Sequence, residues 1–330
     1  MEIIIKDDPT PPDEVLEALA HHMPYSLPAS RRIQFMKTSA GRQTAHSHIL
    51  STFATSVSSS TSSPTPAPEF LIAYLDFSRG PNTEMWLYSS IEHPTIPSSA
   101  AVCEAQLLAL LKHVAGLEQE YVKLNSVSAP RENQGTVLIA SLHVKVWELL
   151  QKHSLVKMQS PEHLKFLFKV ADLPGVRELP EGLVWASVRA EDIPLVLSRT
   201  AIPYKAELMK ALPSVAIQTS AGVPIAWAFL GPDGSLKTLH CEEEYRGRGL
   251  AKAVSVKLLR DRAVDLVQDG WYHADVAVEN LQSQGVCRSL KGTVEWSLYC
   301  TCLDPYILDH AKTRDALVYF ILKLSGAPFL

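Results

Sequence analysis

The sequence of 330 residues lacks the features that mark several large classes of protein. Positive charge is not in surplus, because 31 Lys and Arg face 35 Asp and Glu and the net charge is −4. Such a chain has no global attraction for nucleic acid or an anionic membrane. No stretch approaches the roughly 18 apolar residues of a membrane span, and the N-terminal apolar run is too short for a signal peptide. We therefore expect a protein of the cytoplasm or nucleus that binds neither nucleic acid nor membrane.

Cysteine is also scarce, and its pattern argues against a disulfide framework. The chain has 5 Cys, an odd and scattered set that is typical of reduced intracellular thiols. Residues 21–22, 46–48 and 300–302 bring His or Cys pairs close together, but none has the paired spacing of a zinc site. We expect no metal cofactor, and a chain of this length can bury a core without disulfides or a structural metal.

Two stretches of biased composition interrupt the chain. Residues 51–68 consist almost entirely of Ser, Thr, Pro and Ala, which predicts a mobile surface insertion. Residues 172–182 are punctuated by Pro and Gly and form the best domain boundary. The sequence thus predicts an N-terminal domain at 1–175 and a C-terminal domain at 176–330.

Hydrophobic patterning gives both halves the same order of elements, which is strand, strand, helix, strand, helix. In the first half, strands are predicted at 70–77, 85–91 and 136–142, and helices at 100–116 and 144–153. In the second half, strands are predicted at 184–188, 215–219, 225–230, 236–241, 272–278 and 293–299, and helices at 192–198, 246–267 and 281–290. The repetition suggests two copies of one αβ framework, although low identity between the halves leaves a duplication open.

The segment 239–251 carries the strongest chemical signal, because it leads from a predicted strand into a predicted helix through two glycines. Gly247 and Gly249 would each cost about 1 kcal/mol relative to Ala inside a helix, so a close approach of the backbone to a ligand would explain them. Amides at a helix N-terminus carry partial positive charge that suits a pyrophosphate. The alternative is an ordinary loop in which Arg246 and Arg248 are solvated surface charges.

Two other phosphate-binding motifs fail on this sequence. A dinucleotide fingerprint would need Gly or Ala where Lys252 stands, and no GxxxxGK(S/T) occurs. What remains is Arg-x-x-Gly-x-Ala at Arg246, Gly249 and Ala251, which resembles the signature of the GNAT superfamily of acyl-CoA-dependent N-acyltransferases. The resemblance continues downstream to Asn280, which would open the next helix, and to Ser283.

The resemblance covers about residues 183–300. Within the superfamily, the chain is similar to the glycine N-acyltransferase-like enzymes, which join a degenerate N-terminal half to a catalytic C-terminal half. It implies an α/β (α+β) fold of two tandem GNAT-like halves, each a mixed, mostly antiparallel twisted sheet flanked by helices. In the N-terminal half, prolines at 93–97 replace the glycine loop, so this half should not bind CoA. The resemblance implies that acyl-CoA is bound by Leu239, Cys241, Arg246, Gly247, Arg248, Gly249, Leu250, Ala251, Asn280 and Ser283.

The catalytic candidates lie next to this segment. Acyl transfer needs a neutral amine, so a positioned carboxylate is a useful base, and the resemblance implies that Glu244 has this role. The alternative reading of three consecutive acids is an electrostatic cap of the helix, and it suits Glu242 and Glu243 better. His240 is a further candidate base, with a packed strand histidine as the alternative.

The departing thiolate raises a separate question. Many relatives protonate it with a Tyr, but the spacing from Asn280 places Cys287 at that position. A thiol of ordinary pKa near 8.5 could donate a proton. CoA thiolate is also a tolerable leaving group, so the alternative is a step that needs no acid.

We therefore predict an N-acyltransferase that moves an acyl group from acetyl-CoA or another acyl-CoA to the amine of a small molecule or peptide. The amine would attack the thioester directly. The alternative is a non-catalytic protein of degenerate GNAT fold that binds CoA or serves as an interaction module; Cys287 favours this alternative and the intact glycine segment opposes it. The acceptor, the acyl length and the oligomeric state have no readable signature in the sequence.

Overall fold

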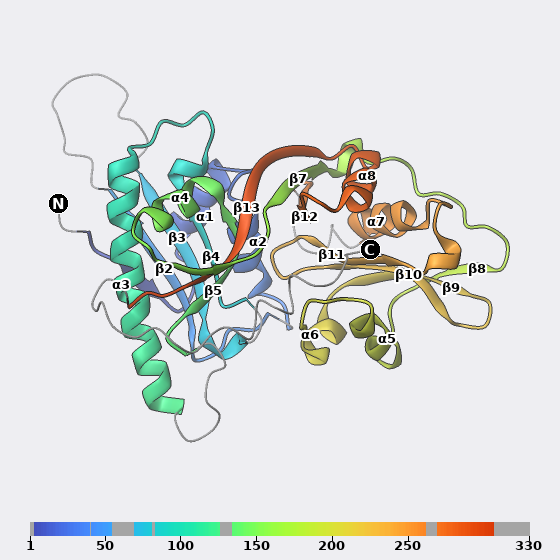
Figure 1. The fold of residues 1–330 in the computed structure, drawn as a ribbon, viewed down its shortest axis with the longest axis horizontal. Helices are drawn as coiled ribbons and strands as arrows, with labels where there is room; N and C mark the ends of the chain where they lie inside the picture. Colours follow the sequence, from blue (N-terminus) through green and yellow to red (C-terminus); the bar gives the residue numbers. More distant parts are fainter. Residues whose placement is uncertain are drawn as a thin grey trace. The chain divides into compact units, whose positions relative to one another are not determined.

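The computed structural model describes residues 3–39, 41–54, 69–80, 83–125, 134–261 and 269–306. The chain divides into two compact units. Of the described residues, unit 1 contains those that fall within Met1–Ile33 and Gln43–Ser160 and those from Tyr299 onward, and unit 2 contains those that fall within Gln34–Arg42 and Pro161–Leu298. Each unit combines β-strands with α-helices (Figure 1).

The sheet of unit 1 runs in the order β1-β2-β3-β4-β5. Neighbours from β1 to β4 are antiparallel, whereas β4 and β5 are parallel. All seven residues of β3 are buried, because helices cover both faces of this strand. The strands of unit 1 are β1 (Lys6–Asp8), β2 (Ser47–Phe53), β3 (Phe70–Asp76), β4 (Met85–Ser89), β5 (Val137–His143) and β6 (Val156–Gln159).

Helices α3 and α4 of unit 1 bury apolar side chains on this sheet. Leu107, Leu110 and Leu111 of the long helix α3 pack with Leu71 and Leu75 of β3 in one hydrophobic core. Both segments were apolar at the expected spacing, so their burial follows from the pattern. The helices are α1 (Asp13–His21), α2 (Leu27–Phe35), α3 (Ala100–Asn125) and α4 (Val144–Lys152).

Helix α3 also has the length and apolar composition of a membrane span. Its most apolar window of 18 residues has a mean hydropathy of 1.4, which differs from the expectation that no stretch approaches a membrane span. The core of unit 1 accounts for this composition, because α3 supplies much of that core. Helices that lie in the core of a globular domain often pass the same test.

Unit 2 contains a four-stranded antiparallel sheet with the order β11-β10-β9-β8, and a second set of strands in which β7 pairs with both β12 and β13. Strand β13 pairs with β7 through Thr293–Leu298. Its last residues, 301–303, belong to unit 1 and pair there with β6. The strands are β7 (His163–Lys169), β8 (Leu183–Ala186), β9 (Ser214–Thr219), β10 (Pro224–Leu230), β11 (Leu236–Cys241), β12 (Trp271–Ala277) and β13 (Thr293–Leu303).

Helices lie on both faces of the strands of unit 2 (Figure 1). Helices α7 and α8 pack on one face, where Val254 and Leu258 join the larger core. Helices α5 and α6 pack on the other face around Trp227 and Phe229, together with Phe35 from the N-terminal part of the chain. The helices are α5 (Ile193–Ser198), α6 (Ala206–Ala211), α7 (Leu250–Asp261) and α8 (Leu281–Ser289).

Three expectations about organisation need correction. Residues 51–53 of the expected insertion form the end of β2 and pair with β3, and 55–68 lie outside the described residues. The division between units falls after Ser160, not at 175/176, because β7 pairs with strands of unit 2. The helix expected from 246 begins at Leu250, and 262–268 lie outside the described residues.

Candidate functional site

The candidate site lies where the strands of unit 2 part. Ser235 and His273 form an isolated parallel bridge at the start of β11 and β12. Beyond that bridge, β11 pairs with β10 and β12 pairs with β7, so the two strands are end strands of different sets. The edges of β11 and β12 that face each other therefore carry backbone groups that can bind an extended ligand.

A bulge interrupts β11 at this edge. Trp227 pairs with His240 and Phe229 pairs with Lys237, so β11 holds one extra residue opposite Ala228. Thr238 has a φ of 51°, which is a left-handed conformation that a Thr rarely adopts. A bulge leaves one residue of the strand out of the ladder and re-aims its neighbours.

A glycine turn connects β11 to helix α7. The chain passes through a short 3-10 turn at Glu243–Tyr245, and α7 begins at Leu250. Gly247 and Gly249 have φ values of 73° and 77°, so the backbone itself requires glycine at both positions. The first amides of α7 have no partner within the helix, and their partial positive charge favours an anion.

Three arginines hold the backbone of this turn. Arg246 Nε donates to the Cys241 carbonyl at 3.1 Å, and Arg248 Nη2 donates to the Glu244 carbonyl at 3.1 Å. Arg177 Nη1 donates to the Arg248 carbonyl at 3.0 Å. Sequence reasoning missed Arg177, because it lies outside the motif and no local pattern marks it.

The acidic residues before the turn have different surroundings. Glu242 accepts a hydrogen bond from Arg199 Nε at 2.9 Å, and its other oxygen lies 3.5 Å from His240 Nε2. Glu244 is exposed, and its carboxylate has no ion pair or hydrogen bond within the described part of the chain. Of these two carboxylates, only that of Glu244 is available to a substrate without first losing a partner.

His240 is packed more tightly than a typical base. Its ring stacks on Trp227 with centroids 4.6 Å apart, and only 8% of the residue is exposed. Burial lowers the pKa of His240, and the nearby Glu242 only partly opposes this. The ring is therefore neutral at physiological pH, and its position agrees with the packed alternative for this residue.

Asn280 and Cys287 lie on helix α8. Asn280 Oδ1 accepts a hydrogen bond from the Ser283 backbone N–H at 3.0 Å, so it caps the helix. The Cys287 side chain is buried, and burial raises its pKa to about 12. A thiol with that pKa is a weak proton donor to a departing thiolate.

A buried network of charged side chains lies at the point where β11 and β12 part. Lys165 of β7 is fully buried; its Nζ contacts Asp275 Oδ1 of β12 and lies 3.0 Å from His273 Nδ1. His273 Nε2 lies 2.8 Å from the Asp233 carbonyl, which makes Nε2 the protonated nitrogen and Nδ1 the acceptor. The network ties the start of β11 to β7 and β12.

The corresponding position in unit 1 is filled by the protein itself. His93 Nδ1 accepts hydrogen bonds from the backbone N–H groups of Thr95 and Ile96 at 3.3 and 3.0 Å. The Ser99 N–H donates to Glu69 Oε1 at 3.1 Å just before α3 begins. These amides already have acceptors, so an anion would have to displace them.

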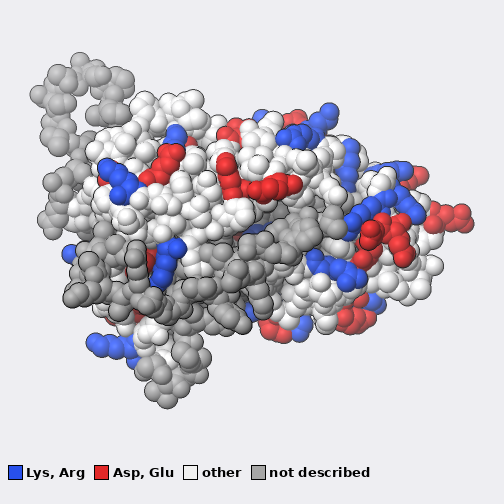
Figure 2. Space-filling view, viewed as in Figure 1, with Lys and Arg blue, Asp and Glu red and all other residues white. Residues whose placement is uncertain are grey.

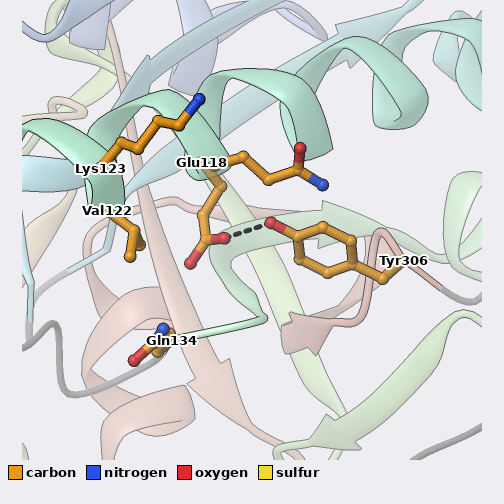
Figure 3. Close-up of a pocket in the computed structure, with 6 residues that line it drawn as sticks. Glu118, Val122, Lys123, Gln134 and Tyr306 are labelled. Carbon is orange, nitrogen blue, oxygen red and sulfur yellow. Dashed lines mark hydrogen bonds between the residues drawn. The ribbon is translucent and has the colours of Figure 1, made fainter.

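Unit 1 contains a pocket whose lining residues are distant in sequence from the glycine turn. It has a volume of about 420 Å³ and lies beside α3 (Figure 3). In Figure 3 the Glu118 carboxylate points toward the Tyr306 hydroxyl, which donates to it. The Gly135 N–H donates to the other carboxylate oxygen at 3.0 Å. The lining residues are Glu118, Gln119, Val122, Lys123, Gln134 and Tyr306.

The distribution of charged and metal-ligating side chains completes the description of the surface and the core. Lys and Arg side chains alternate with Asp and Glu on the face shown in Figure 2, so neither sign gathers there. Within the described ranges, no group of three or more His, Cys, Asp or Glu side chains could hold a metal ion. All five cysteines are free thiols.

The split strands, the bulge and the glycine turn before a helix define the GNAT class of αβ folds. The family described as the acyl-CoA N-acyltransferase verG N-terminal domain matches residues 1–166. The chain belongs to this family, within the GNAT superfamily. Its fold is therefore that of two GNAT-like halves, as expected, with mixed, mostly antiparallel sheets flanked by helices. No curated protein matches the sequence.

Several solved structures are similar to this chain. A Drosophila protein aligns with a TM-score of 0.60 and 14% identity, over 92% of this chain and 99% of its own. A tandem GNAT protein from the clavulanic acid biosynthesis pathway has a TM-score of 0.49 and 11% identity, over 92% and 98%. A GCN5-related N-acetyltransferase from Sphaerobacter thermophilus has a TM-score of 0.48 and 14% identity, over 91% and 94%. At these identities the likeness to the Drosophila protein concerns the fold alone.

Proposed function

We propose that the chain is an N-acyltransferase that transfers an acyl group from acetyl-CoA or another acyl-CoA to the amine of a small molecule or peptide. The observation that carries the proposal is the turn at 246–249, whose two left-handed glycines lead into α7 beside the parted strands. Family membership supports the same activity. We further propose that the protein acts in the cytoplasm or nucleus.

The glycine turn and β11 would bind different parts of acyl-CoA. The pyrophosphate is an anion of the size that helix N-terminal amides bind, and the exposed backbone at 247–249 leaves room for it. The amide-bearing arm of acyl-CoA can pair with the free edge of β11, where the bulge at Thr238 releases backbone groups from the ladder. Leu239 and Cys241 belong to this strand, and Asn280 and Ser283 lie just beyond β12.

Acyl transfer then needs one proton acceptor. The neutral amine attacks the thioester carbonyl carbon, the C–S bond breaks, and the CoA thiolate takes up a proton as CoA thiol. We assign the removal of the amine proton to Glu244, because its carboxylate is exposed and has no other partner among the described residues. Glu242 is tied to Arg199, and the buried Cys287 is a weak acid, so the thiolate would be protonated by solvent.

The test compares turnover of purified wild-type protein, Glu244→Gln and the matched control Glu243→Gln on an amine panel from about pH 6 to 10. General-base contributions are about 10²–10⁴-fold, so Glu244→Gln should lose at least about a hundred-fold in kcat and keep its affinity for acyl-CoA. Its rate should recover toward high pH, because the acceptor amine deprotonates by itself. Glu243→Gln should follow the wild-type profile.

Two results would contradict the proposal. Parallel pH profiles for wild type and Glu244→Gln would remove Glu244 as the base and leave His240 or water. Tight CoA binding without turnover on any amine would favour the non-catalytic protein of degenerate fold. We also propose that residues 93–99 of unit 1 do not bind CoA. CoA binding that persists in a variant with a disrupted glycine turn would contradict this part of the proposal.

A further inference from the structure

A segment outside the motif reaches the glycine turn from the far end of α7. The connection between β7 and β8 passes along α7 (Figure 1). Near the C-terminal end of α7, Arg260 Nη2 and Nε donate to the carbonyls of Leu173 and Pro174 at 2.6 and 3.2 Å. Near its N-terminal end, Arg177 Nη1 donates to the Arg248 carbonyl. The segment 173–177 is thus anchored at both ends of the helix, and it brings Arg177 to the turn.

The position of Arg177 relative to the turn is specific. Its Nη1 lies 3.2 Å from where a Cβ on Gly249 would stand, so the guanidinium is in contact with the backbone of the motif. In a trans peptide the carbonyl and the following N–H point in opposite directions. Because the Arg248 carbonyl points at Arg177, the Gly249 N–H points away from it. Arg177 therefore lies on the side of the turn opposite to that amide.

The charge around the turn favours a second anion on that side. Arg177 and Arg248 are exposed cations next to the positive end of the α7 dipole, and like charges so close together repel each other. A guanidinium has five N–H donors in a planar fork that suits a phosphate. The contact with Arg248 uses one of these donors on Arg177, and the side chain is exposed.

We propose that Arg177 binds the 3′-phosphate of CoA and so makes the site selective for CoA over its dephosphorylated form. This inference rests on the proposed function, because the phosphate belongs to the acyl-CoA whose pyrophosphate the turn would bind. CoA carries phosphate at two places, the pyrophosphate and the 3′-phosphate, and the amides of the turn account for the pyrophosphate. Arg177, on the carbonyl side of the same turn, accounts for the other.

The experiment measures dissociation constants of CoA and dephospho-CoA by calorimetry for wild type, Arg177→Met and the control Lys210→Met. Lys210 is a cation of α6 whose Nζ pairs with Glu207. A charge-assisted hydrogen bond on an exposed side chain predicts about a ten-fold preference of wild type for CoA. Arg177→Met should bind CoA about ten-fold more weakly and dephospho-CoA unchanged, Arg177→Lys should retain part of the preference, and Lys210→Met should behave as wild type.

Each other outcome overturns a defined step. If wild type binds neither compound, the proposed function fails. If wild type binds both equally and Arg177→Met does the same, the turn binds CoA but Arg177 has no part in it. If Arg177→Met weakens both compounds by the same factor while its circular dichroism is unchanged, Arg177 positions the turn and does not bind the 3′-phosphate. High salt should reduce the preference of wild type, because the contact is between exposed charges.

Discussion

The buried Lys165–Asp275 pair gives a prediction about the stability of unit 2. Replacing Lys165 with Met keeps most of the side-chain volume but leaves the Asp275 carboxylate without its cation. Removal of one partner of a buried ion pair costs about 3–5 kcal/mol. The Asp275 side chain is 22% exposed, so water partly replaces the lysine and the lower end, about 3 kcal/mol, is expected. For a domain of this size that is about 6–12 °C in Tm.

The pH dependence of this loss identifies its cause. Burial alone would raise the pKa of Asp275, but the Lys165 ammonium outweighs it and holds that pKa well below its usual range. In wild type the carboxylate therefore stabilises the fold above about pH 3.9, its unfolded pKa, and this contribution is lost as the pH falls further. Without Lys165 the pKa of Asp275 rises, so the variant should be most deficient at pH 7–8 and approach wild type toward pH 4.

The assay is denaturant unfolding followed by tryptophan fluorescence at several pH values. Lys169→Met is the matched control, because Lys169 is an exposed cation on the same strand, 4.9 Å from the Trp271 ring. It should cost about 0.5–1 kcal/mol, as expected for an exposed cation–π contact. The double variant Lys165→Met with Asp275→Asn should regain most of the loss. A variant as stable as wild type at pH 7, or a double variant no better than Lys165→Met, would refute the reasoning.

Two further variants test the candidate site. Gly249→Val should weaken CoA binding by at least about a hundred-fold with an unchanged circular dichroism spectrum, because φ is 77° and Arg177 lies 3.2 Å from the new Cβ. The control is Gly116→Ala, where a Cβ meets no atom within 4 Å. Unchanged affinity of Gly249→Val for CoA would disprove the assignment of the turn. Cys287→Ser should keep kcat within about three-fold of wild type, because a thiol with a pKa of about 12 is a poor general acid. A hundred-fold or greater loss of kcat would instead identify Cys287 as the general acid.

Much of the fold could be predicted because its signals are local. The expected strands at 215–219, 225–230 and 236–241 coincide with β9, β10 and β11, where apolar runs are bounded by turn residues. Strand β7 was missed, because Lys165 stands among its apolar residues and reads as a solvent position. Strand β2 was missed because its last residues share the Ser and Thr composition of the stretch that follows.

In the candidate site, too, only the features that are local in sequence could be predicted. The glycine turn is contiguous in sequence, and its conformational requirement shows in the residue type itself. Arg177 lies 71 residues from the carbonyl it contacts, and Lys165 lies 108 residues from His273. Contacts of this kind depend on strand pairing and on the path of a connection, and no local pattern encodes either.

The two halves differ in the backbone groups that are bonded in the turn before the long helix. In both, a strand leads through a short turn into a long helix, α3 in unit 1 and α7 in unit 2. Before α3 the backbone N–H groups of Ile96 and Ser99 donate to the side chains of His93 and Glu69, so the protein supplies its own acceptors. Before α7 the left-handed glycines keep side chains away from the backbone, Arg246 and Arg248 bond carbonyls, and residues 247–249 are exposed. What separates the two sites is therefore which backbone groups the neighbouring side chains bind, the amides in unit 1 and the carbonyls in unit 2.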